Sequence, residues 1–347
     1  MKLTMKSELL VLSADDVQRL VRTALKPEKV VQCMARVFEM SSSTEIEEPY
    51  LSTLSPEHTT FYMPCRLPAP VNESSLVYSA VKVASVSRTG GGNGVPGTTL
   101  VLDETTGAAR AILNSRTLTA LRNAAGSVLA TQLLGPKKPT HITFFGAGLQ
   151  IKQHASLFIQ TYPSITHCTV INRSLNDRLK ELLADLTLEF PGICLEGIVL
   201  GSHGVEPAVR GADIICCATS STRPLFDSKW LKNGAHVNLI GSYTPAMREA
   251  DTGLIERAGR RVVVDEIKAC LVDAGELVDA VMTEKELVEI GTLVCAGATK
   301  TLEEVRQAGN VTVFKSVGLG AQDVAIAALM VELAEKNGKV GTRILYD

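Results

Sequence analysis

The fold is decided by the segment Thr140-His-Ile-Thr-Phe-Phe-Gly-Ala-Gly-Leu-Gln150, in which a short apolar run ends in Gly-x-Gly and continues as a helical pattern. Gly146 permits a tight turn, and Gly148 lets backbone N–H groups approach a pyrophosphate at the N-terminus of the following helix. Ile151 stands where the usual fingerprint has its third glycine, so the prediction depends on the strand–turn–helix order. We predict a dinucleotide-binding turn made of Gly146, Ala147, Gly148, Leu149 and Gln150.

The second predicted strand of this region, 165–171, ends in Asn172, Arg173 and Ser174. An NAD site usually has Asp or Glu at this place, where the carboxylate binds the ribose 2′-hydroxyl. An amide, a guanidinium and a hydroxyl suit a 2′-phosphate instead, because arginine forms paired charge-assisted hydrogen bonds with phosphate. The pattern favours NADPH over NADH as the cofactor. The alternative is a solvated arginine at the start of the helix that follows.

Length and composition are those of an ordinary globular protein. A chain of 347 residues fits two domains, at roughly 150 residues per domain. Hydrophobic residues make up 45% and charged residues 21%, which allows a sizeable core. The net charge of -2 and the aromatic content of 4% give no sign of nucleic acid or of an anionic membrane as a partner.

The 8 cysteines are scattered, and none forms a Cys-x-x-Cys pair. Cys216 and Cys217 fall inside an apolar, strand-like run, so buried reduced thiols explain the pattern better than disulfides or a zinc site. The histidines show no metal-ligand spacing, and we predict no metal. The N-terminus lacks a basic segment followed by an apolar core, and no apolar run approaches about 18 residues, so we expect a cytoplasmic protein.

The order of predicted elements changes near residue 140. Before it, the predicted elements are helices near 14–24, 27–40 and 117–134 and strands at 59–63, 76–87, 98–103 and 108–113, with a glycine-rich loop at 90–94. After it, short apolar strands alternate with helices, which is typical of a parallel sheet. The final strand, 311–316, and helix, 322–336, are expected to return to the first domain.

Two later strands, 213–217 and 236–240, are followed by polar turns. Ligands of parallel sheets lie beyond the carboxyl ends of the strands. We therefore expect these turns to face the nicotinamide half of the cofactor, through Thr219, Ser220, Gly241 and Ser242.

Lys82 lies on an otherwise apolar face of the strand 76–87. Side chains alternate along a strand, so the lysine shares its face with Leu76, Tyr78, Ala80, Ala84 and Val86. A lysine in such a place needs a partner or loses its charge through desolvation. It is therefore a candidate for binding a substrate carboxylate or for donating a proton. The alternative is an edge-strand lysine that reaches water.

Arg122 lies on the predicted helix 117–134 among small residues, which allow a ligand to approach closely. Its guanidinium suits a carboxylate or a phosphate, although an exposed helix arginine is the simpler interpretation. Asp323 opens the last predicted helix, where its expected role is to cap the helix.

Taken together, these segments resemble the ornithine cyclodeaminase/mu-crystallin family over roughly residues 10–335. The resemblance rests on ordered motifs, of which the most specific are Val81-Lys82-Val83, Pro96-Gly97-Thr98, Leu118-Thr119-Ala120-Leu121-Arg122-Asn123-Ala124-Ala125, Gly146-Ala147-Gly148, Asn172-Arg173-Ser174, Gly234-Ala235-His236-Val237-Asn238 and Phe314-Lys315-Ser316-Val317-Gly318. It implies an α/β protein with a Rossmann-type domain, residues 126–311, inserted into an α+β domain for substrate binding and dimerisation, residues 1–125 plus 312–347.

The resemblance also implies roles for individual residues. Lys82 and Arg122 match residues that contact the substrate carboxylate and the cofactor, and Thr98 is assigned to the cofactor. Ser316 and Val317 match the loop that lines the substrate pocket. The Asn172-Arg173-Ser174 segment looks like the NADPH-type signature of the mu-crystallin branch.

Two departures from the family pattern bear on the reaction. Cyclodeaminases carry an aspartate in a Gly-Asp-x-Pro turn, and Tyr243 stands at that place here. A phenol with a pKa of about 10 can donate a proton but is a poor base at neutral pH. The carboxylate-binding arginine of the family is replaced by Leu51, and Arg66 is a candidate for the substitute cation.

We therefore predict an NADPH-dependent reductase that acts on the C=N bond of a small imine, either a cyclic ketimine or an imino acid. Lys82 and Arg122, with Arg66 as a further candidate, hold the carboxylate, and Tyr243 or Lys82 protonates the nitrogen. The alternatives are an ornithine cyclodeaminase that recycles bound NAD and a non-catalytic protein that binds NADPH and a small ligand. A homodimer is expected.

Overall fold

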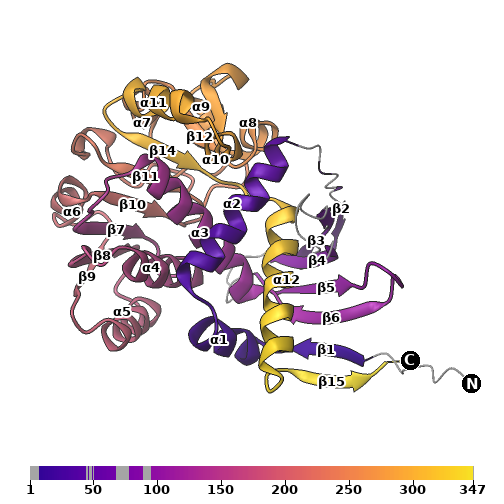
Figure 1. The fold of residues 1–347 in the computed structure, drawn as a ribbon. Coiled ribbons are helices and arrows are strands. Elements are labelled where there is room, and N and C mark those ends of the chain that lie inside the picture. Colours follow the sequence, from indigo (N-terminus) through magenta and orange to yellow (C-terminus); the bar gives the residue numbers. More distant parts are fainter. Residues whose placement is uncertain are drawn as a thin grey trace, which may run out of the picture. The chain divides into compact units, whose positions relative to one another are not determined.

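The computed structural model describes residues 8–43, 46, 49, 51–67, 78–88 and 95–346. The chain divides into two compact units (Figure 1). Unit 1 comprises Met1–Val37, Thr44–Arg122 and Leu319–Asp347, and unit 2 comprises Phe38–Ser43 and Asn123–Gly318. The glycine-rich loop at 90–94 and Leu76, which we placed beside Lys82, lie outside the described residues.

Unit 1 is built on a seven-stranded sheet in the order β15-β1-β6-β5-β4-β3-β2. Neighbouring strands run antiparallel, except that β1 and β6 are parallel. The strands are β1 (Glu8–Leu12), β2 (Leu51–Leu54), β3 (His58–Leu67), β4 (Tyr78–Ser87), β5 (Gly97–Leu102), β6 (Ala109–Asn114) and β15 (Thr342–Leu345). The predicted antiparallel strands are confirmed, whereas β1, β2 and β15 were not predicted.

One helix, α12 (Gly320–Asn337), covers the middle of this sheet and packs against β3, β4 and β5. Almost all of its first four turns are buried, which its run of alanines and branched aliphatic residues allows. Helix α1 (Ala14–Thr23) packs against α12 and β6, and Ser13 caps its N-terminus. The division between the units falls within α2 (Pro27–Ser43) and α3 (Arg116–Leu134).

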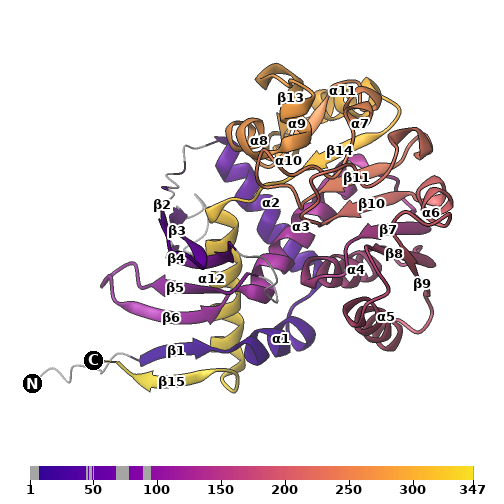
Figure 2. The same ribbon diagram turned by 180° about the vertical axis from the view of Figure 1, so that it is seen from behind.

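Unit 2 is built on an eight-stranded, fully parallel sheet in the order β13-β12-β14-β11-β10-β7-β8-β9 (Figure 2). The strands are β7 (His141–Phe145), β8 (His167–Asn172), β9 (Cys194–Val199), β10 (Ile214–Cys217), β11 (His236–Leu239), β12 (Val262–Val264), β13 (Leu287–Glu289) and β14 (Thr312–Lys315). Every residue of β10, β11, β12 and β14 is buried, as expected for central strands covered on both faces.

The strand order of this sheet reverses between β7 and β10. From β7 the chain moves outward to β8 and β9, then returns to β10 on the other side of β7. In sheets of this kind, ligands bind beyond the carboxyl ends of the strands at such a point. The predicted dinucleotide-binding turn follows β7 and therefore lies at this switch point.

Helices cover both faces of the parallel sheet. On one face, Asn238 of β11 donates to the Thr131 hydroxyl of α3 at 3.2 Å. On the other, the Thr143 hydroxyl of β7 donates to Ala208 of the helix α6 at 3.1 Å. The helices of unit 2 after α3 are α4 (Leu149–Thr161), α5 (Asp177–Glu189), α6 (Val205–Gly211), α7 (Thr252–Arg257), α8 (Ile267–Asp273), α9 (Gly275–Asp279), α10 (Ile290–Val294) and α11 (Thr299–Ala308).

The last strand differs from our expectation. We placed the segment 311–316 in the first domain, but β14 pairs with β11 and β12 near the middle of the parallel sheet. A final apolar strand next to a helix has the same local pattern in either sheet, so only its partners decide the matter. The return to unit 1 occurs at Leu319, just before α12.

None of the helices in the described part of the chain is long and apolar enough to cross a lipid bilayer.

Candidate active site

A buried cluster of three charged side chains lies in unit 1. Lys82 of β4 donates to the Asp323 carboxylate of α12 at 2.9 Å, and Arg122 of α3 donates to the other oxygen of that carboxylate at 3.3 Å. Arg122 also donates to the side-chain oxygen of Gln322 at 2.9 Å. The exposed fractions are 6% for Lys82, 6% for Arg122 and 4% for Asp323. The sequence left open whether Lys82 has a partner, loses its charge or reaches water, and in the structure it is buried with Asp323 as its partner.

The electrostatics of this cluster favour an anionic ligand. Burial lowers the pKa of Lys82, and Arg122 adds to this effect while Asp323 opposes it. Burial raises the pKa of Asp323, but Lys82 and Arg122 outweigh burial, and the net pKa lies below its ordinary value. The carboxylate therefore stays ionised between two cations. An ammonium and a guanidinium that share one carboxylate are groups that also bind the carboxylate of a ligand.

Asp323 has a different role from the one we expected. Helix α12 begins at Gly320, so Asp323 lies beyond the capping position, and its carboxylate binds the two cations instead. The partners of Asp323 are 241 and 201 residues away in the sequence. No local pattern could have identified them.

The structure does not bring Arg66 to this cluster. Cross-strand partners share a face, and the pairs Lys82↔Met63 and Arg66↔Ser79 are three residues apart along each strand, so Arg66 points away from Lys82. Its side chain is 63% exposed and pairs with Glu104 at 3.2 Å. Leu51, at the place of the family arginine, is an exposed residue of the edge strand β2. Thr98 also lies in unit 1, on β5, where it pairs with Val83.

The predicted dinucleotide-binding turn has the required backbone in unit 2. Gly146 follows β7 with φ +110°, a conformation that side chains disfavour, and its N–H donates to Ile171 of β8 at 2.8 Å. Gly148 is the N-cap of α4 and gives the helix no side-chain cap. A Cβ at Gly148 would meet no atom within 4 Å, so space is open above the helix N-terminus. Ile151, at the place of the third glycine, is fully buried.

The segment after β8 presents polar groups to solvent. Arg173 and Ser174 are exposed, and Asn172 folds back to donate to the Ser174 carbonyl at 3.0 Å. In Rossmann folds the end of this second strand lies near the adenosine ribose. Arg173 is thus exposed directly after β8, the second strand of this sheet in chain order.

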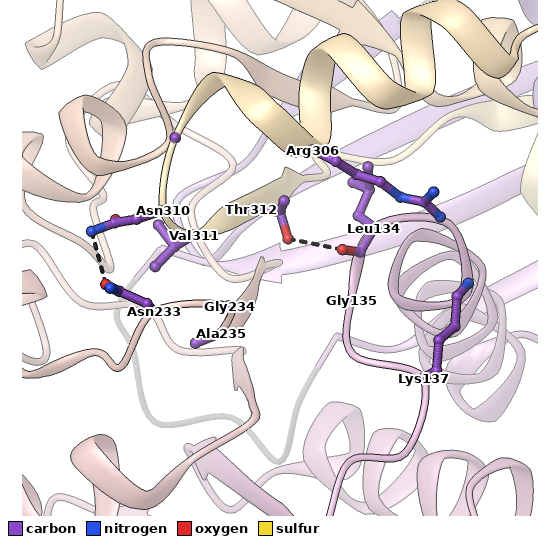
Figure 3. A pocket seen from close by; sticks show the side chains of 11 residues that line it. Leu134, Gly135, Lys137, Asn233, Gly234, Ala235, Arg306, Asn310, Val311 and Thr312 are labelled. Carbon is purple, nitrogen blue, oxygen red and sulfur yellow. Dashed lines mark hydrogen bonds between the residues drawn. The ribbon is translucent and has the colours of Figure 1, made fainter.

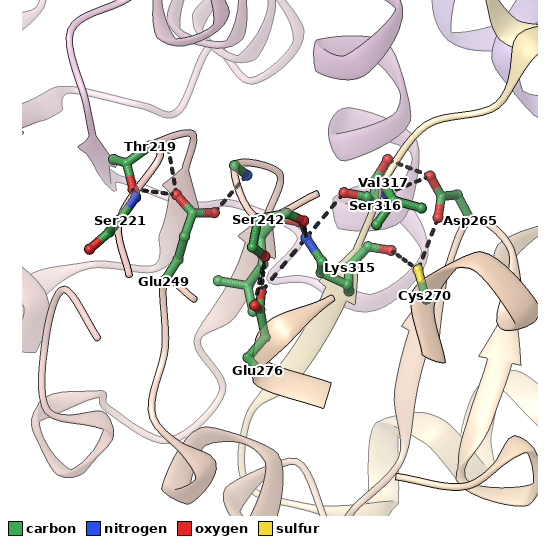
Figure 4. A network of polar contacts seen from close by, with 12 residues as sticks. Thr219, Ser221, Ser242, Glu249, Asp265, Cys270, Glu276, Lys315, Ser316 and Val317 are labelled. Carbon is green, nitrogen blue, oxygen red and sulfur yellow. Dashed lines mark hydrogen bonds and ion pairs between the residues drawn. The ribbon is translucent and has the colours of Figure 1, made fainter. Parts of the chain in front are cut away.

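The turns after β10 and β11 are held by buried carboxylates that the sequence did not reveal (Figure 4). Glu249 accepts hydrogen bonds from the Thr219 N–H at 2.6 Å, the Thr219 hydroxyl at 2.8 Å and the Gly241 N–H at 2.7 Å. The Ser242 hydroxyl donates to Glu276 at 2.6 Å and 2.7 Å. Ser220 lies exposed on the same turn as Thr219. Neither glutamate lies within a recognisable motif.

A second polar network surrounds the end of β14. Lys315 is fully buried and donates to the carbonyl oxygens of Ser242 at 2.6 Å and Ser316 at 3.2 Å, with Glu276 at 3.7 Å. The Asp265 carboxylate accepts from the Ser316 hydroxyl at 2.6 Å, the Val317 N–H at 3.0 Å and the Gly318 N–H at 2.6 Å. The predicted substrate loop, Ser316 and Val317, is thus fixed by a residue outside it.

Tyr243 follows Ser242 in the turn after β11. Its side chain is exposed, with a residue exposure of 42%, and partial burial raises its pKa above the ordinary value. The phenol is therefore protonated at neutral pH and can donate a proton, but it cannot serve as a base.

A separate depression of about 430 Å³ lies in unit 2 at the amino ends of the strands, opposite to the ends that carry the glycine turn (Figure 3). Its lining includes Gly234 and Ala235, which precede β11, and Val311 and Thr312 at the start of β14. Cofactors of parallel sheets bind at the carboxyl ends, so this depression is not the cofactor site. Among the residues that the structure describes, no group of three or more His, Cys, Asp or Glu side chains could hold a metal ion.

Comparison with protein families gives a match over most of the chain. The model of the ornithine cyclodeaminase/mu-crystallin family matches residues 17–338. A relative from Colwellia psychrerythraea, named Delta(1)-pyrroline-2-carboxylate reductase, is 34% identical over 236 residues, which are 65% of this chain and 70% of the relative. The ketimine reductase mu-crystallin of Mus musculus is 29% identical over 232 residues, 67% of each chain.

Comparison with solved structures gives the same fold. The Delta(1)-pyrroline-2-carboxylate reductase of Thermococcus litoralis, solved with NADH and L-proline, superposes with a TM-score of 0.81. The match covers 96% of this chain and 100% of that chain at 24% sequence identity. The predicted α/β fold with a Rossmann-type parallel sheet is confirmed.

Proposed function

The chain belongs to the ornithine cyclodeaminase/mu-crystallin family, and on this premise we propose that it is an NADPH-dependent reductase of a small imine that carries a carboxylate. Two of its relatives are named for the reduction of a cyclic imino acid or a ketimine. The observation that carries the proposal is the buried cluster of Lys82, Arg122 and Asp323, whose two cationic groups suit a substrate carboxylate. The substrate class is a cyclic ketimine or an imino acid.

The cofactor site fits a dinucleotide. The open space above Gly148 and the helix N-terminus without a side-chain cap suit a pyrophosphate, which the N–H groups of α4 would hold. Arg173, with Asn172 and Ser174, would bind the 2′-phosphate and so favour NADPH over NADH. Thr219, Ser220, Gly241 and Ser242 would line the nicotinamide half, and Gln150 and Thr98 remain proposed cofactor contacts. When bound, the reduced nicotinamide supplies the hydride for the imine carbon.

The residues of the chain would hold and protonate the substrate. Lys82 and Arg122 bind the carboxylate, and Ser316 and Val317 line the pocket. The imine nitrogen must carry a proton for its carbon to be electrophilic, and Lys82 or Tyr243 provides that proton. Both are proton donors: the pKa of Lys82 is lowered by burial, which makes the transfer easier, and Tyr243 stays protonated. Most of the rate acceleration would come from correct positioning of the hydride-donating nicotinamide carbon and the imine carbon that accepts the hydride.

Tyr243 also argues against the cyclodeaminase reaction. Removal of an α-amino group needs a base, for which the cyclodeaminases use an aspartate by resemblance. A tyrosine with a raised pKa cannot take that role at neutral pH.

The test is to mix the purified protein with NADPH and Δ1-pyrroline-2-carboxylate or Δ1-piperideine-2-carboxylate and to follow the absorbance of the reduced nicotinamide. We expect oxidation of NADPH and formation of the cyclic amino acid. Release of ammonia from ornithine with no net change in NADP(H) would establish a cyclodeaminase instead. Tight binding of NADPH with no turnover across an imine panel would indicate a non-catalytic binding protein.

We also propose a homodimer. In unit 1, both edge strands of the sheet are exposed along their length, and they carry large apolar side chains: Leu51, Leu54 and Leu345 are 62%, 73% and 65% exposed. Exposed apolar edges favour pairing with another chain. Sedimentation equilibrium of the purified protein would distinguish a dimer from a monomer.

A further inference from the structure

The carboxylate of Glu249 bridges two loops that follow neighbouring strands of the parallel sheet. One oxygen accepts from the Thr219 N–H and hydroxyl, in the loop after β10, and the other accepts from the Gly241 N–H, in the loop after β11. Glu249 lies in the second of these loops, between β11 and α7 and 8 residues after Gly241, and it is fully buried (Figure 4).

The two bridged loops touch each other closely. A Cβ on Gly241 would lie 2.0 Å from the Thr219 carbonyl oxygen and 2.3 Å from its nitrogen, so no side chain fits there. The backbone beside Glu249 is tied to the first loop as well. Leu225 N–H donates to the Glu249 carbonyl at 2.9 Å, and Arg248 N–H donates to the Ser221 carbonyl at 2.8 Å.

The charges around Glu249 come from three other elements of unit 2. Burial raises its pKa to about 7; Lys315 on β14 opposes the shift and Glu276 on α9 adds to it. The buried thiols of Cys216 and Cys217, on β10, are close enough for the Glu249 carboxylate to raise their pKa values further. A protonated Glu249 keeps all its partners, because its O–H can donate to the Thr219 hydroxyl while both N–H groups still find acceptor oxygens. The bridge therefore depends on two oxygens more than on the charge.

We propose that Glu249 is a positioning residue, which sets the spacing of the Thr219 and Gly241 loops and thereby holds the nicotinamide half of the cofactor in place. This inference rests on the proposed function, because it takes these loops to flank the nicotinamide at the carboxyl ends of β10 and β11. Glu249 touches neither cofactor nor substrate in this account and acts only through the two loops.

The variant Glu249→Gln tests the bridge because an amide has the same shape but only one acceptor oxygen. In either orientation its NH₂ group faces a backbone N–H, of Thr219 or of Gly241, and one loop is released. We expect kcat for imine reduction to fall about 10- to 100-fold, the size of effect that a misplacement of about 1 Å produces. The variant Glu249→Asp, which keeps the charge but is too short to reach both loops, should show the same loss. Glu256→Gln, an exposed residue of α7, is the matched control and should be unchanged.

The decisive measurement is calorimetric binding of two ligands, NADPH and adenosine 2′,5′-bisphosphate, which lacks the nicotinamide. We expect Glu249→Gln to weaken NADPH at least about fivefold and to leave the bisphosphate within about twofold, since the loops contact only the nicotinamide half. Equal weakening of both ligands, or no change in NADPH binding and kcat, would overturn the inference. If Glu249→Gln is not recovered folded, Glu249→Asp carries the same comparison. A wild-type protein that binds NADPH but reduces no imine would refute the proposed reaction and leave the binding comparison valid.

Discussion

Two buried charge clusters, one in each unit, contain the same kinds of side chain in opposite proportions. In unit 1, Lys82 and Arg122 share the carboxylate of Asp323. In unit 2, Glu276 pairs with the fully buried ammonium of Lys315, and Glu249 lies in the same network. Burial is nearly complete in both clusters, so burial alone does not distinguish them.

The partners of the charged groups do distinguish them. In unit 2 the carboxylates accept hydrogen bonds from backbone N–H groups and hydroxyls of the same unit, so they hold loops in place. In unit 1 two cations share one carboxylate, and such cations suit the carboxylate of a ligand. A buried cluster in which two cations share a carboxylate is therefore a candidate for binding, and a cluster whose carboxylates accept from the backbone is a candidate for positioning.

The largest expected effect comes from breaking the unit 1 cluster at its carboxylate. Asp323→Asn removes the buried carboxylate that Lys82 and Arg122 share, which should cost about 3–5 kcal/mol of unfolding free energy. Urea unfolding followed by circular dichroism measures it. Asp185→Asn, which breaks the exposed pair with Lys152, should change stability by less than about 1 kcal/mol. If the two variants lose equal amounts of unfolding free energy, the charge of Asp323 does not stabilise the cluster.

Removing a cation from the same cluster should affect activity more than stability. Lys82→Met leaves Arg122 paired with Asp323, so the fold tolerates the change, but the substrate carboxylate loses a partner. We expect kcat/KM for Δ1-pyrroline-2-carboxylate to fall about 30- to 1000-fold, or about 2–4 kcal/mol. Arg66→Met, on the opposite face of the sheet, should keep wild-type kcat/KM. If Arg66→Met lowers kcat/KM and Lys82→Met does not, Arg66 binds the substrate carboxylate instead.

The unit 2 cluster predicts an unusual dependence of stability on pH. Glu249 has a raised pKa of about 7 in the folded protein, so the folded state binds the proton more tightly than the unfolded state. Its contribution to stability is therefore fully present below the pKa of the unfolded state, about 4.3, and is lost as the pH rises through about 7. Between about pH 5 and about pH 8, the unfolding free energy of wild type should fall by about 1–3 kcal/mol more than that of Glu249→Gln. If the difference in unfolding free energy between wild type and Glu249→Gln is the same at both pH values, Glu249 does not titrate in this range.

The smallest effect concerns an exposed cation outside both clusters. Arg173→Ala should weaken NADPH binding about tenfold, or about 1.4 kcal/mol, and leave NADH unchanged, because only NADPH carries the 2′-phosphate. Calorimetric titration with each nucleotide measures both. If both nucleotides weaken equally, Arg173 acts on something the two share, and the assignment of NADPH loses its support.

Much of the fold could be predicted from local pattern. The apolar strands alternating with helices after residue 140 indicated a parallel sheet, and Gly146 and Gly148 marked the turn at its switch point. The alternation along β4 placed Lys82 on an apolar face, which made burial one of two interpretations, and the structure shows that it is buried. These features are local because backbone conformation and side-chain periodicity are set by a few neighbouring residues.

The partners of these residues were decided only by the tertiary structure. Asp323 meets Lys82 across 241 residues, Glu249 meets Thr219 across 30, and β14 joins the parallel sheet although its own pattern suits either sheet. Arg66 was a reasonable candidate by sequence, and the pleat of β3 turned it to the other face. The sequence by itself determined most of the strands, several of the helices and the glycine turn, and it marked Lys82 as a residue that could carry charge into the interior. Which charged residues are buried together depended on how distant strands and helices pack, because contacts between remote segments leave no periodic trace in the chain.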